Sequence, residues 1–230
     1  MSRTFEVDAG RLQDARDALD AAGAAIAAGE LVVVPTETVY GIACRPEDEG
    51  ATGQLFAAKR RPQALNLPVL TSSAGVAWYL GVKTDLAGAL ARRFWPGPLT
   101  LVLDRTEVTI PWRLGERTDS IGLRVPDHPL TRGLLDRTGP LAVTSANVTG
   151  EPPLDEPEAI RATFGSAIAV YLFLPRGAPR AGGASSTVLD LTSPLNVTRI
   201  LRQGPLRREE VAEALAELGG RITSERPRGC

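Results

Sequence analysis

Short apolar runs alternate along the chain with amphipathic patterns, and each run ends at a proline, a glycine or a polar turn. The runs predict buried strands, and apolar residues at every third or fourth position predict helices between them. Strands are expected at residues 31–34, 67–70, 99–103, 121–125, 141–143, 168–174, 186–191 and 197–201. Helices are expected at residues 11–28, 51–59, 84–94, 129–137 and 209–218, with one more starting at 155 or 156. This alternation predicts an α/β layer structure.

The last strands predict the type of sheet. They follow one another without helices between them, so the sheet is expected to be mixed and not purely parallel. A chain of 230 residues with 43% hydrophobic side chains can bury a true core within one large domain. We expect that domain to cover residues 1–206, with a C-terminal helix and polar tail over 207–230 as an appendage.

Charge and cysteine content exclude several classes of protein. The 26 basic and 27 acidic side chains give a net charge of −1. This excludes a nucleic-acid binder that works through global charge, although a local basic patch stays open. The 2 cysteines lack the spacing of a disulfide scaffold or a metal site. The N-terminal residues lack the apolar stretch of a signal peptide, and no window approaches a transmembrane length, so a cytoplasmic protein without membrane contact is expected.

Four polar segments carry side chains suited to ligand binding. They are residues 35–41 (PTETVYG), 59–61 (KRR), 144–147 (TSAN) and 185–187 (SST). Ligands of open α/β sheets bind outside strand ends, which makes the hydroxyl, amide and cationic groups there, and the carboxylate of the first segment, candidates for ligand contacts. Each segment taken alone also fits a structural role as a turn, a helix cap or a hairpin.

Several common catalytic and nucleotide-binding motifs are absent from the sequence. His128 is the single histidine of the sequence, which excludes a metal cluster built on histidines. For His128 itself, a structural role or a place at the edge of a site is favoured over a catalytic role. The sequence has no GxSxG elbow, Walker loop or GxGxxG fingerprint. Arg124 and Arg202 lie in strand-like stretches, where each needs an anionic partner, either a carboxylate or a ligand phosphate.

Seven segments in a fixed order carry a resemblance to a known family. They are residues 34–41 (VPTETVYG), 59–62 (KRRP), 94–100 (FWPGPLT), 122–129 (GLRVPDHP), 144–150 (TSANVTG), 186–190 (STVLD) and 201–204 (LRQG). Together they resemble the YrdC-like family of threonylcarbamoyl-AMP synthases over about residues 11–206. The resemblance implies a single YrdC-like domain, in which helices pack on a twisted, open mixed sheet with a concave ligand-binding face.

The resemblance also implies a reaction. Such enzymes use L-threonine, bicarbonate and ATP to make threonylcarbamoyl-adenylate and pyrophosphate, and a downstream threonylcarbamoyl transferase complex then modifies tRNA. Magnesium is expected on the triphosphate, without a dedicated set of protein ligands. Attack of a carbamate oxygen on the α-phosphate needs positioning and positive charge but no protein nucleophile, which agrees with the residues present. A contact with tRNA or double-stranded RNA stays open.

By similarity, the catalytic residues would be Lys59, Arg61, Ser145 and Asn147. These side chains would also bind the nucleotide, with the two cations gripping phosphates and carbamate.

The remaining contacts implied by the resemblance divide between the two substrates. Thr36, Tyr40 and Arg124 would hold threonine and carbamate, and Arg124 would also reach the nucleotide. Ser186 and Arg202 would bind the nucleotide and its phosphates.

The sequence departs from the family pattern beside Arg61. Asn66 stands where many relatives carry the proline of a Pro-Leu pair, and Arg60 stands where a small residue is common. Because proline fixes φ and asparagine does not, the loop beside the phosphates is expected to differ. Neither change removes a predicted ligand.

Two other functions stay open at this point. One is a non-catalytic module that binds double-stranded RNA by shape in RNA or ribosome maturation. The other is a carbamoyl-adenylate-forming carbamoyltransferase, whose relatives carry zinc-finger and further domains.

Overall fold

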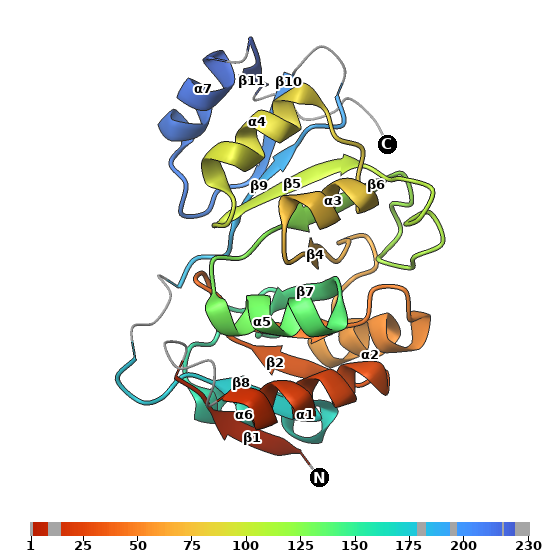
Figure 1. The fold of residues 1–230 in the computed structure, drawn as a ribbon, viewed down its shortest axis with the longest axis vertical. Coiled ribbons are helices and arrows are strands. Elements are labelled where there is room, and N and C mark those ends of the chain that lie inside the picture. The colour runs from red at the N-terminus through yellow and green to blue at the C-terminus, as the bar shows by residue number, and fades with distance from the viewer. Residues whose placement is uncertain (1, 9–14, 179–182, 194–196, 218, 224–230) are drawn as a thin grey trace.

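The computed structural model describes residues 2–8, 15–178, 183–193, 197–217 and 219–223. Their strands form one 11-stranded sheet in the order β1-β8-β2-β3-β7-β4-β6-β5-β9-β10-β11, which runs from the lower to the upper end of Figure 1. Parallel pairs such as β5 and β9 occur beside antiparallel pairs such as β5 and β6. The predicted α/β fold with an open mixed sheet is confirmed.

The strands are short, and those near the middle of the sheet are almost fully buried. In spatial order they are β1 (Arg3–Glu6), β8 (Val170–Phe173), β2 (Val32–Val34), β3 (Gly41–Cys44), β7 (Leu141–Ser145), β4 (Val69–Leu70), β6 (Ser120–Arg124), β5 (Leu99–Asp104), β9 (Thr187–Asp190), β10 (Val197–Arg202) and β11 (Arg221–Thr223).

Five of the described helices begin at a capping side chain or a proline. Asp48 accepts a hydrogen bond from Ala51 N at 3.0 Å, and Thr84 accepts one from Ala87 N at 3.1 Å. Such side chains satisfy backbone N–H groups that have no partner inside the helix. The described helices are α1 (Arg16–Ala27), α2 (Glu49–Lys59), α3 (Ala74–Leu80), α4 (Asp85–Phe94), α5 (Pro129–Thr138), α6 (Pro157–Phe164) and α7 (Arg208–Ala216).

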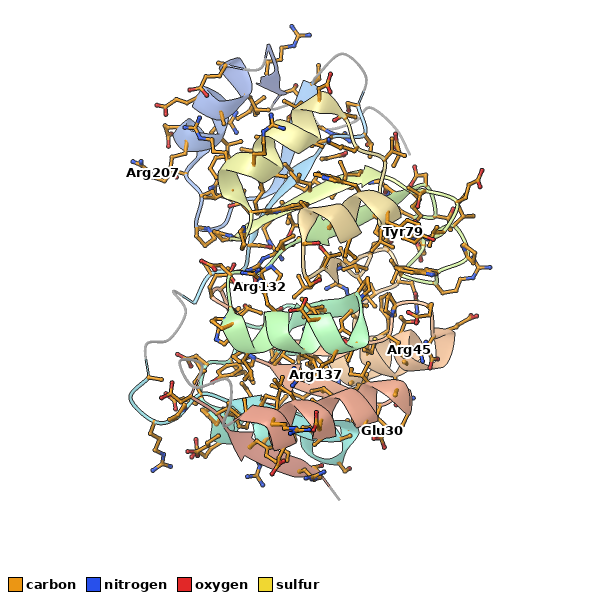
Figure 2. All side chains as sticks on the ribbon, in the orientation of Figure 1. Glu30, Arg45, Tyr79, Arg132, Arg137 and Arg207 are labelled. Atoms are coloured by element: carbon orange, nitrogen blue, oxygen red, sulfur yellow. The ribbon has the colours of Figure 1, made fainter. Side chains whose placement is uncertain are left out.

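Side chains alternate between the two faces of the sheet, as the period of a strand requires. In β2, Val32 and Val34 pack in the cluster that contains α1 and α5, whereas Val33 packs in the larger cluster on the opposite face. Side chains such as Glu30 and Arg137 lie on the outside of the molecule (Figure 2). The sheet is therefore covered on both faces at the β8–β2–β3–β7 end.

The same alternation leaves a hollow at the other end of the sheet. In β5, Leu99 and Leu101 point into the larger core cluster, and Thr100 and Val102 lie on the other face. Val102 pairs in register with Gly122 of β6, and Thr100 pairs with Val188 of β9. All four line one hollow, so this part of the face is not covered by a helix.

The structure adds elements that the apolar patterns did not predict. They are β1, β3, α3 and β11. β1 lies at the edge of the sheet and carries Arg3 and Glu6, so it lacks the apolar run of a central strand. β11 lies within the stretch expected to be a polar tail, and it pairs in parallel with β10.

The C-terminal helix shares the main core of the molecule. Val211, Ala214 and Leu215 of α7 are buried in the same cluster as the leucines of β5. The proposed division of the chain between residues 206 and 207 stays a prediction. The first part of the helix expected at 11–28 and residue 218 of the helix expected at 209–218 lie outside the described residues.

Candidate functional site

A hollow of about 550 Å³, part of it open to solvent, lies on the uncovered face of the sheet. We call it the central hollow. It is enclosed by the turn after β2, the loop after α2, and the ends of β6, β7 and β10. It brings together six of the nine predicted site residues, which are Thr36, Arg61, Arg124, Ser145, Ser186 and Arg202.

Two further hollows adjoin the central one. The leucine-side hollow is lined by Leu65, Leu67 and Leu201, and it shares Arg61 and Arg202 with the central hollow. The tyrosine-side hollow is lined by Tyr40, Leu154 and Leu174, and it shares the turn at residues 36–39 with the central hollow. Because neighbouring hollows share lining residues, we refer to the three together as the groove.

Three guanidinium groups from distant segments meet in the central hollow. Burial, and then the nearby Arg202, lower the pKa of Arg61 to about 10. Burial, and then Arg124, lower the pKa of Arg202. Positive charges gathered in one largely buried place form a site that a bound anion stabilises. The hollow is therefore suited to phosphate or carboxylate groups.

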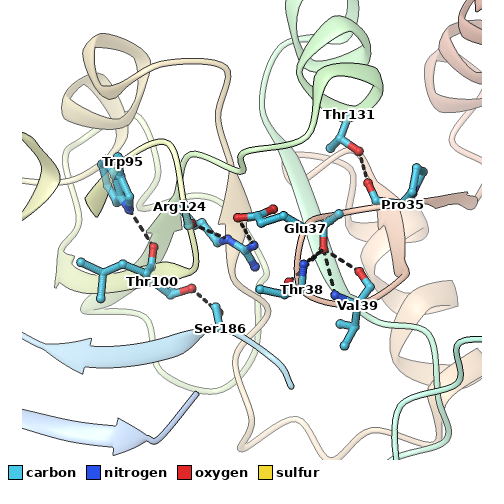
Figure 3. A network of polar contacts seen from close by, with 12 residues as sticks. Pro35, Glu37, Thr38, Val39, Trp95, Thr100, Arg124, Thr131 and Ser186 are labelled. Carbon is cyan, nitrogen blue, oxygen red and sulfur yellow. Dashed lines mark hydrogen bonds and ion pairs between the residues drawn. The ribbon is translucent and has the colours of Figure 1, made fainter. Parts of the chain in front are cut away.

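The end of β10 positions Arg202 against Ser186. Arg202 donates from Nε to the Ser186 carbonyl at 2.9 Å and from Nη2 to its Oγ at 3.1 Å. Ser186 Oγ also lies 2.8 Å from Thr100 Oγ1 (Figure 3). A Cβ at Gly204 would lie 2.3 Å from Ser185 O, so only glycine permits this close approach of the two chain segments.

Asn66 explains how the loop after α2 tolerates the absence of a proline. Arg61 donates to the carbonyl oxygens of Leu65 at 2.7 Å and Asn66 at 2.9 Å. The Asn66 side chain donates to Arg117 O at 2.6 Å and accepts from Arg117 N at 3.1 Å. These hydrogen bonds fix the loop in the absence of a proline ring, and the carbonyl groups of the loop in turn hold Arg61.

Lys59 lies beneath the central hollow and does not line it. It is 1% exposed, and its ammonium donates to Ser145 O, to Asn147 O at 2.5 Å and to Asn147 Oδ1 at 3.3 Å. An ammonium has three donors, so these oxygens occupy all of them. Burial, and then Arg61, lower the pKa of Lys59 to about 7. Contact between Lys59 and a ligand would require the exchange of one of these bonds.

Asn147 stabilises the same turn from the other side. Its Nδ2 donates to Val148 O at 2.9 Å and to Glu151 O at 2.6 Å. Asn147 is buried and lies outside the lining of the hollow, whereas Ser145 lines it. Lys59 and Asn147 thus place Ser145 at the end of β7.

The turn after β2 closes the side of the groove near Tyr40. Thr36 Oγ1 donates to Val39 O at 2.6 Å and accepts from Val39 N at 3.1 Å. Tyr40 Oη accepts from Leu174 N at 3.0 Å, and its ring packs edge to face on Phe173. Tyr40 therefore borders the tyrosine-side hollow, and not the central one.

Sequence reasoning counted the Glu37 carboxylate among the candidate ligand contacts of its segment, but it did not predict a contact between Glu37 and Arg124. Its Oε1 lies 2.7 Å from Nη2 of Arg124, and Figure 3 shows the two side chains facing each other. The available signal was the carboxylate in the PTETVYG segment, together with an arginine in β6 that needed an anionic partner.

Two absences are noted within the part of the chain that the structure describes. No group of three or more His, Cys, Asp and Glu side chains lies close enough to hold a metal ion. No helix there has both the length and the apolar character needed to cross a bilayer.

Comparisons of sequence identify similar proteins. The family model Sua5/YciO/YrdC, described as "Telomere recombination", matches residues 24–204. A Mycobacterium tuberculosis protein, provisionally named a threonylcarbamoyl-AMP synthase, is 39% identical over 220 residues, which cover 94% of this chain and 96% of that relative. The threonylcarbamoyl-AMP synthase of Pyrococcus abyssi is 35% identical over 192 residues, which cover 83% of this chain and 55% of that relative.

A solved structure has the same fold. The crystal structure of P. abyssi Sua5 complexed with L-threonine superposes with a TM-score of 0.78 at 30% identity. The match covers 97% of this chain and 62% of that one. The chain thus spans somewhat over half of the archaeal relatives and nearly all of the mycobacterial one.

Proposed function

The chain belongs to the Sua5/YciO/YrdC family, and we propose that it is a threonylcarbamoyl-AMP synthase. It joins L-threonine, bicarbonate and ATP into threonylcarbamoyl-adenylate and pyrophosphate. The names of the relatives and the threonine complex of the P. abyssi protein support this activity. The product supplies a separate transferase that modifies adenosine in tRNA.

The observation that carries the proposal is the meeting of Arg61, Arg124 and Arg202 in one hollow. In the reaction, the threonine amine and bicarbonate first form a carbamate with loss of water. A carbamate oxygen then bonds to the α-phosphorus, and the bond from that phosphorus to the pyrophosphate oxygen breaks. Fixed guanidinium groups stabilise the charge that spreads over the phosphate oxygens and the leaving pyrophosphate.

In this proposal, the two substrates lie along the groove. The leucine-side hollow shares Arg61 and Arg202 with the central hollow, and leucine and valine side chains form part of its lining, which suits a nucleobase joined to phosphates. The threonine then lies toward the turn at Thr36 and Tyr40, with its carboxylate or carbamate at Arg124. A planar guanidinium binds such groups through two parallel hydrogen bonds.

Ser145 and Lys59 have separate roles in this arrangement. Ser145 lines the central hollow, and a hydroxyl there can donate to a phosphate or carbamate oxygen. Lys59 holds the turn that carries Ser145, and its charge adds to the positive potential under the site. The sequence-based assignment of a direct phosphate contact to Lys59 stays a prediction.

Magnesium enters with ATP in this proposal. The described residues offer no carboxylate cluster for a dedicated ion, and magnesium usually keeps water and phosphate oxygens as ligands. The residues of the groove accordingly bind the nucleotide and leave coordination of the ion to phosphates and water.

The direct test is turnover with a panel of amino acids. The protein is incubated with magnesium-ATP, bicarbonate and threonine, serine or alanine, and the adenylate and pyrophosphate are measured by mass spectrometry. We expect a threonylcarbamoyl-adenylate with threonine, which the variant Arg61→Gln loses. Absence of any adenylate, together with RNA binding that falls steeply with salt, would instead favour the RNA-binding alternative.

A further inference from the structure

Glu37 places a carboxylate beside a group of cations where an anionic substrate is expected to bind. The Arg124 and Glu37 side chains are 7% and 20% exposed, and Nη2 and Oε1 lie 2.7 Å apart. Both carboxylate oxygens and Nη2 are buried, and the contact lacks the angles of a hydrogen bond. The attraction is therefore mainly between the two charges.

Packing alone does not account for this pair. A buried carboxylate whose oxygens accept no hydrogen bond is costly, and an apolar side chain of similar size avoids that cost. The nearby His128 is itself buried, and its Nδ1 has no hydrogen-bond partner among the described residues. A charge at this buried position is costly, and a role in binding an anionic substrate accounts for it.

Arg124 is the group on which that task acts. Its Nε donates to Gly97 O at 3.1 Å, and Nη2 faces Glu37. Gly97 is itself fixed by a hydrogen bond from its N–H to Val125 O at 2.9 Å. The guanidinium is thus held at two of its three nitrogens, and it still lines the central hollow. When an arginine side chain binds a ligand, it loses freedom of rotation about several bonds. An arginine that is already fixed before binding pays a smaller entropic cost.

We propose that Glu37 is a positioning residue that holds Arg124 in the orientation required to bind the carboxylate or carbamate of threonine. This role rests on the proposed synthase function and adds a residue to it. Glu37 acts through Arg124, so a loss of Glu37 matters only while Arg124 is present. It also acts on the affinity for the amino-acid substrate more than on the affinity for ATP.

A double-mutant cycle tests this coupling. The variants are Glu37→Gln, Arg124→Gln and the pair together, and L-threonine binding is measured by calorimetry alongside KM for threonine, KM for ATP and kcat. We expect Glu37→Gln to weaken threonine binding about tenfold, with a smaller change in KM for ATP. Arg124→Gln is expected to weaken it at least as much, and the double variant should match Arg124→Gln alone.

Two further variants distinguish positioning from a structural role. Glu37→Asp keeps the charge and is expected to recover part of the threonine affinity. Glu47→Gln removes the carboxylate from another ion pair, in which Arg45 Nη2 lies 2.6 Å from Glu47 Oε1 and both side chains are more than 40% exposed. This control is expected to change neither KM nor the melting temperature, because exposed pairs contribute little.

Several outcomes would overturn the proposal. Additive effects of Glu37→Gln and Arg124→Gln would show that Glu37 does not act through Arg124. A lower melting temperature with unchanged threonine affinity would show that the pair is only structural. A wild-type protein that makes no adenylate would refute the synthase function, and threonine binding in the same cycle would then decide separately whether Glu37 positions Arg124.

Discussion

Lys59 is a cation buried against uncharged oxygens, with no carboxylate among its hydrogen-bond partners. Its pKa is lowered from 10.5 to about 7 in the folded protein. Between these values the unfolded chain binds the proton that the folded chain has lost, so the free energy of unfolding rises with pH in that window. We expect the free energy of unfolding, measured by urea denaturation, to be higher at pH about 9 than at pH about 7. Each unit by which the pKa is lowered corresponds to at most ~1.4 kcal/mol of this rise. The variant Lys59→Met should lack it, and an equal rise in both proteins would contradict the assignment.

The same variant tests the contribution of Lys59 to turnover. Without the ammonium, the carbonyl oxygens of Ser145 and Asn147 lose their donor, and the turn that presents Ser145 is no longer fixed. We expect pyrophosphate formation to fall about 100-fold, equivalent to ~2.7 kcal/mol of transition-state stabilisation. Turnover like that of the wild type would refute a role for Lys59 in the site.

Ser145 and Asn147 lie in the same segment, but we expect substitution of Ser145 to affect turnover and substitution of Asn147 to affect stability. The Asn147 side chain bonds to Lys59, Val148 and Glu151, so Asn147→Ala should lower the free energy of unfolding by about 1–3 kcal/mol. Ser145 faces the central hollow, so Ser145→Ala should lower turnover and leave stability nearly unchanged. Thermal melting and pyrophosphate release measure the two effects. A loss of stability in Ser145→Ala with unchanged turnover would show that this segment has only a structural role.

At the scale of elements, the contact between β10 and the start of β9 depends on one glycine. A Cβ at Gly204 would lie within 2.6 Å of three backbone atoms of residues 185–187, and backbone cannot move aside as easily as a side chain. We expect Gly204→Ala to cost about 1–3 kcal/mol of stability and to weaken ATP binding, because Arg202 and Ser186 shift with the strand.

A second glycine provides the matched control. Gly53 lies on the exposed side of α2, and a Cβ there would meet nothing within 4 Å. Alanine is the better helix former, so Gly53→Ala should stabilise the protein by about 0.5–1 kcal/mol with unchanged ATP binding. Chemical unfolding and ATP titration of both variants make the comparison, and equal effects would contradict a special role for Gly204.

Arg60 ends α2 in a left-handed conformation, with φ of 50°. That conformation costs a residue with a Cβ roughly 1 kcal/mol, and it turns the chain between Lys59 and Arg61. We expect Arg60→Gly to raise the free energy of unfolding by about this amount, and Arg60→Ala to give no such gain. Urea unfolding of the two variants tests this prediction. An equal increase in the free energy of unfolding in both would show that the backbone conformation of Arg60 is not the cause.

Sequence patterns predicted elements well where local signals were strong. The helix after Thr84 and the helices that begin at Pro129 and Pro157 carry a cap or a first-turn proline, and the structure begins them at or beside these residues. β3 was missed because a glycine and small residues in a short strand give little alternation, and β11 because an edge strand needs no apolar run. Their pairing depends on distant strands, which no local window contains.

On the scale of the whole molecule, the groove joins segments that are far apart in the chain. Arg61, Arg124 and Arg202 reach one hollow only because the fold brings the loop between α2 and β4, the end of β6 and the end of β10 to the same region. The family resemblance predicted most residues of this group. It could not predict that Lys59 lies beneath the hollow, that Asn66 fixes the loop of Arg61, or that Glu37 faces Arg124, because these follow from three-dimensional contacts of individual side chains.

The central claim is that the groove holds a carbamate oxygen against the α-phosphorus of ATP. It is tested most directly by a single turnover with ¹⁸O-labelled bicarbonate, quenched before the label exchanges with water and analysed by mass spectrometry. The account predicts that the adenylate carries two bicarbonate oxygens, one of them in the bond to phosphorus, and that pyrophosphate carries none. Label in inorganic phosphate, with ADP in place of the adenylate, would mean attack at the γ-phosphorus and would contradict the account.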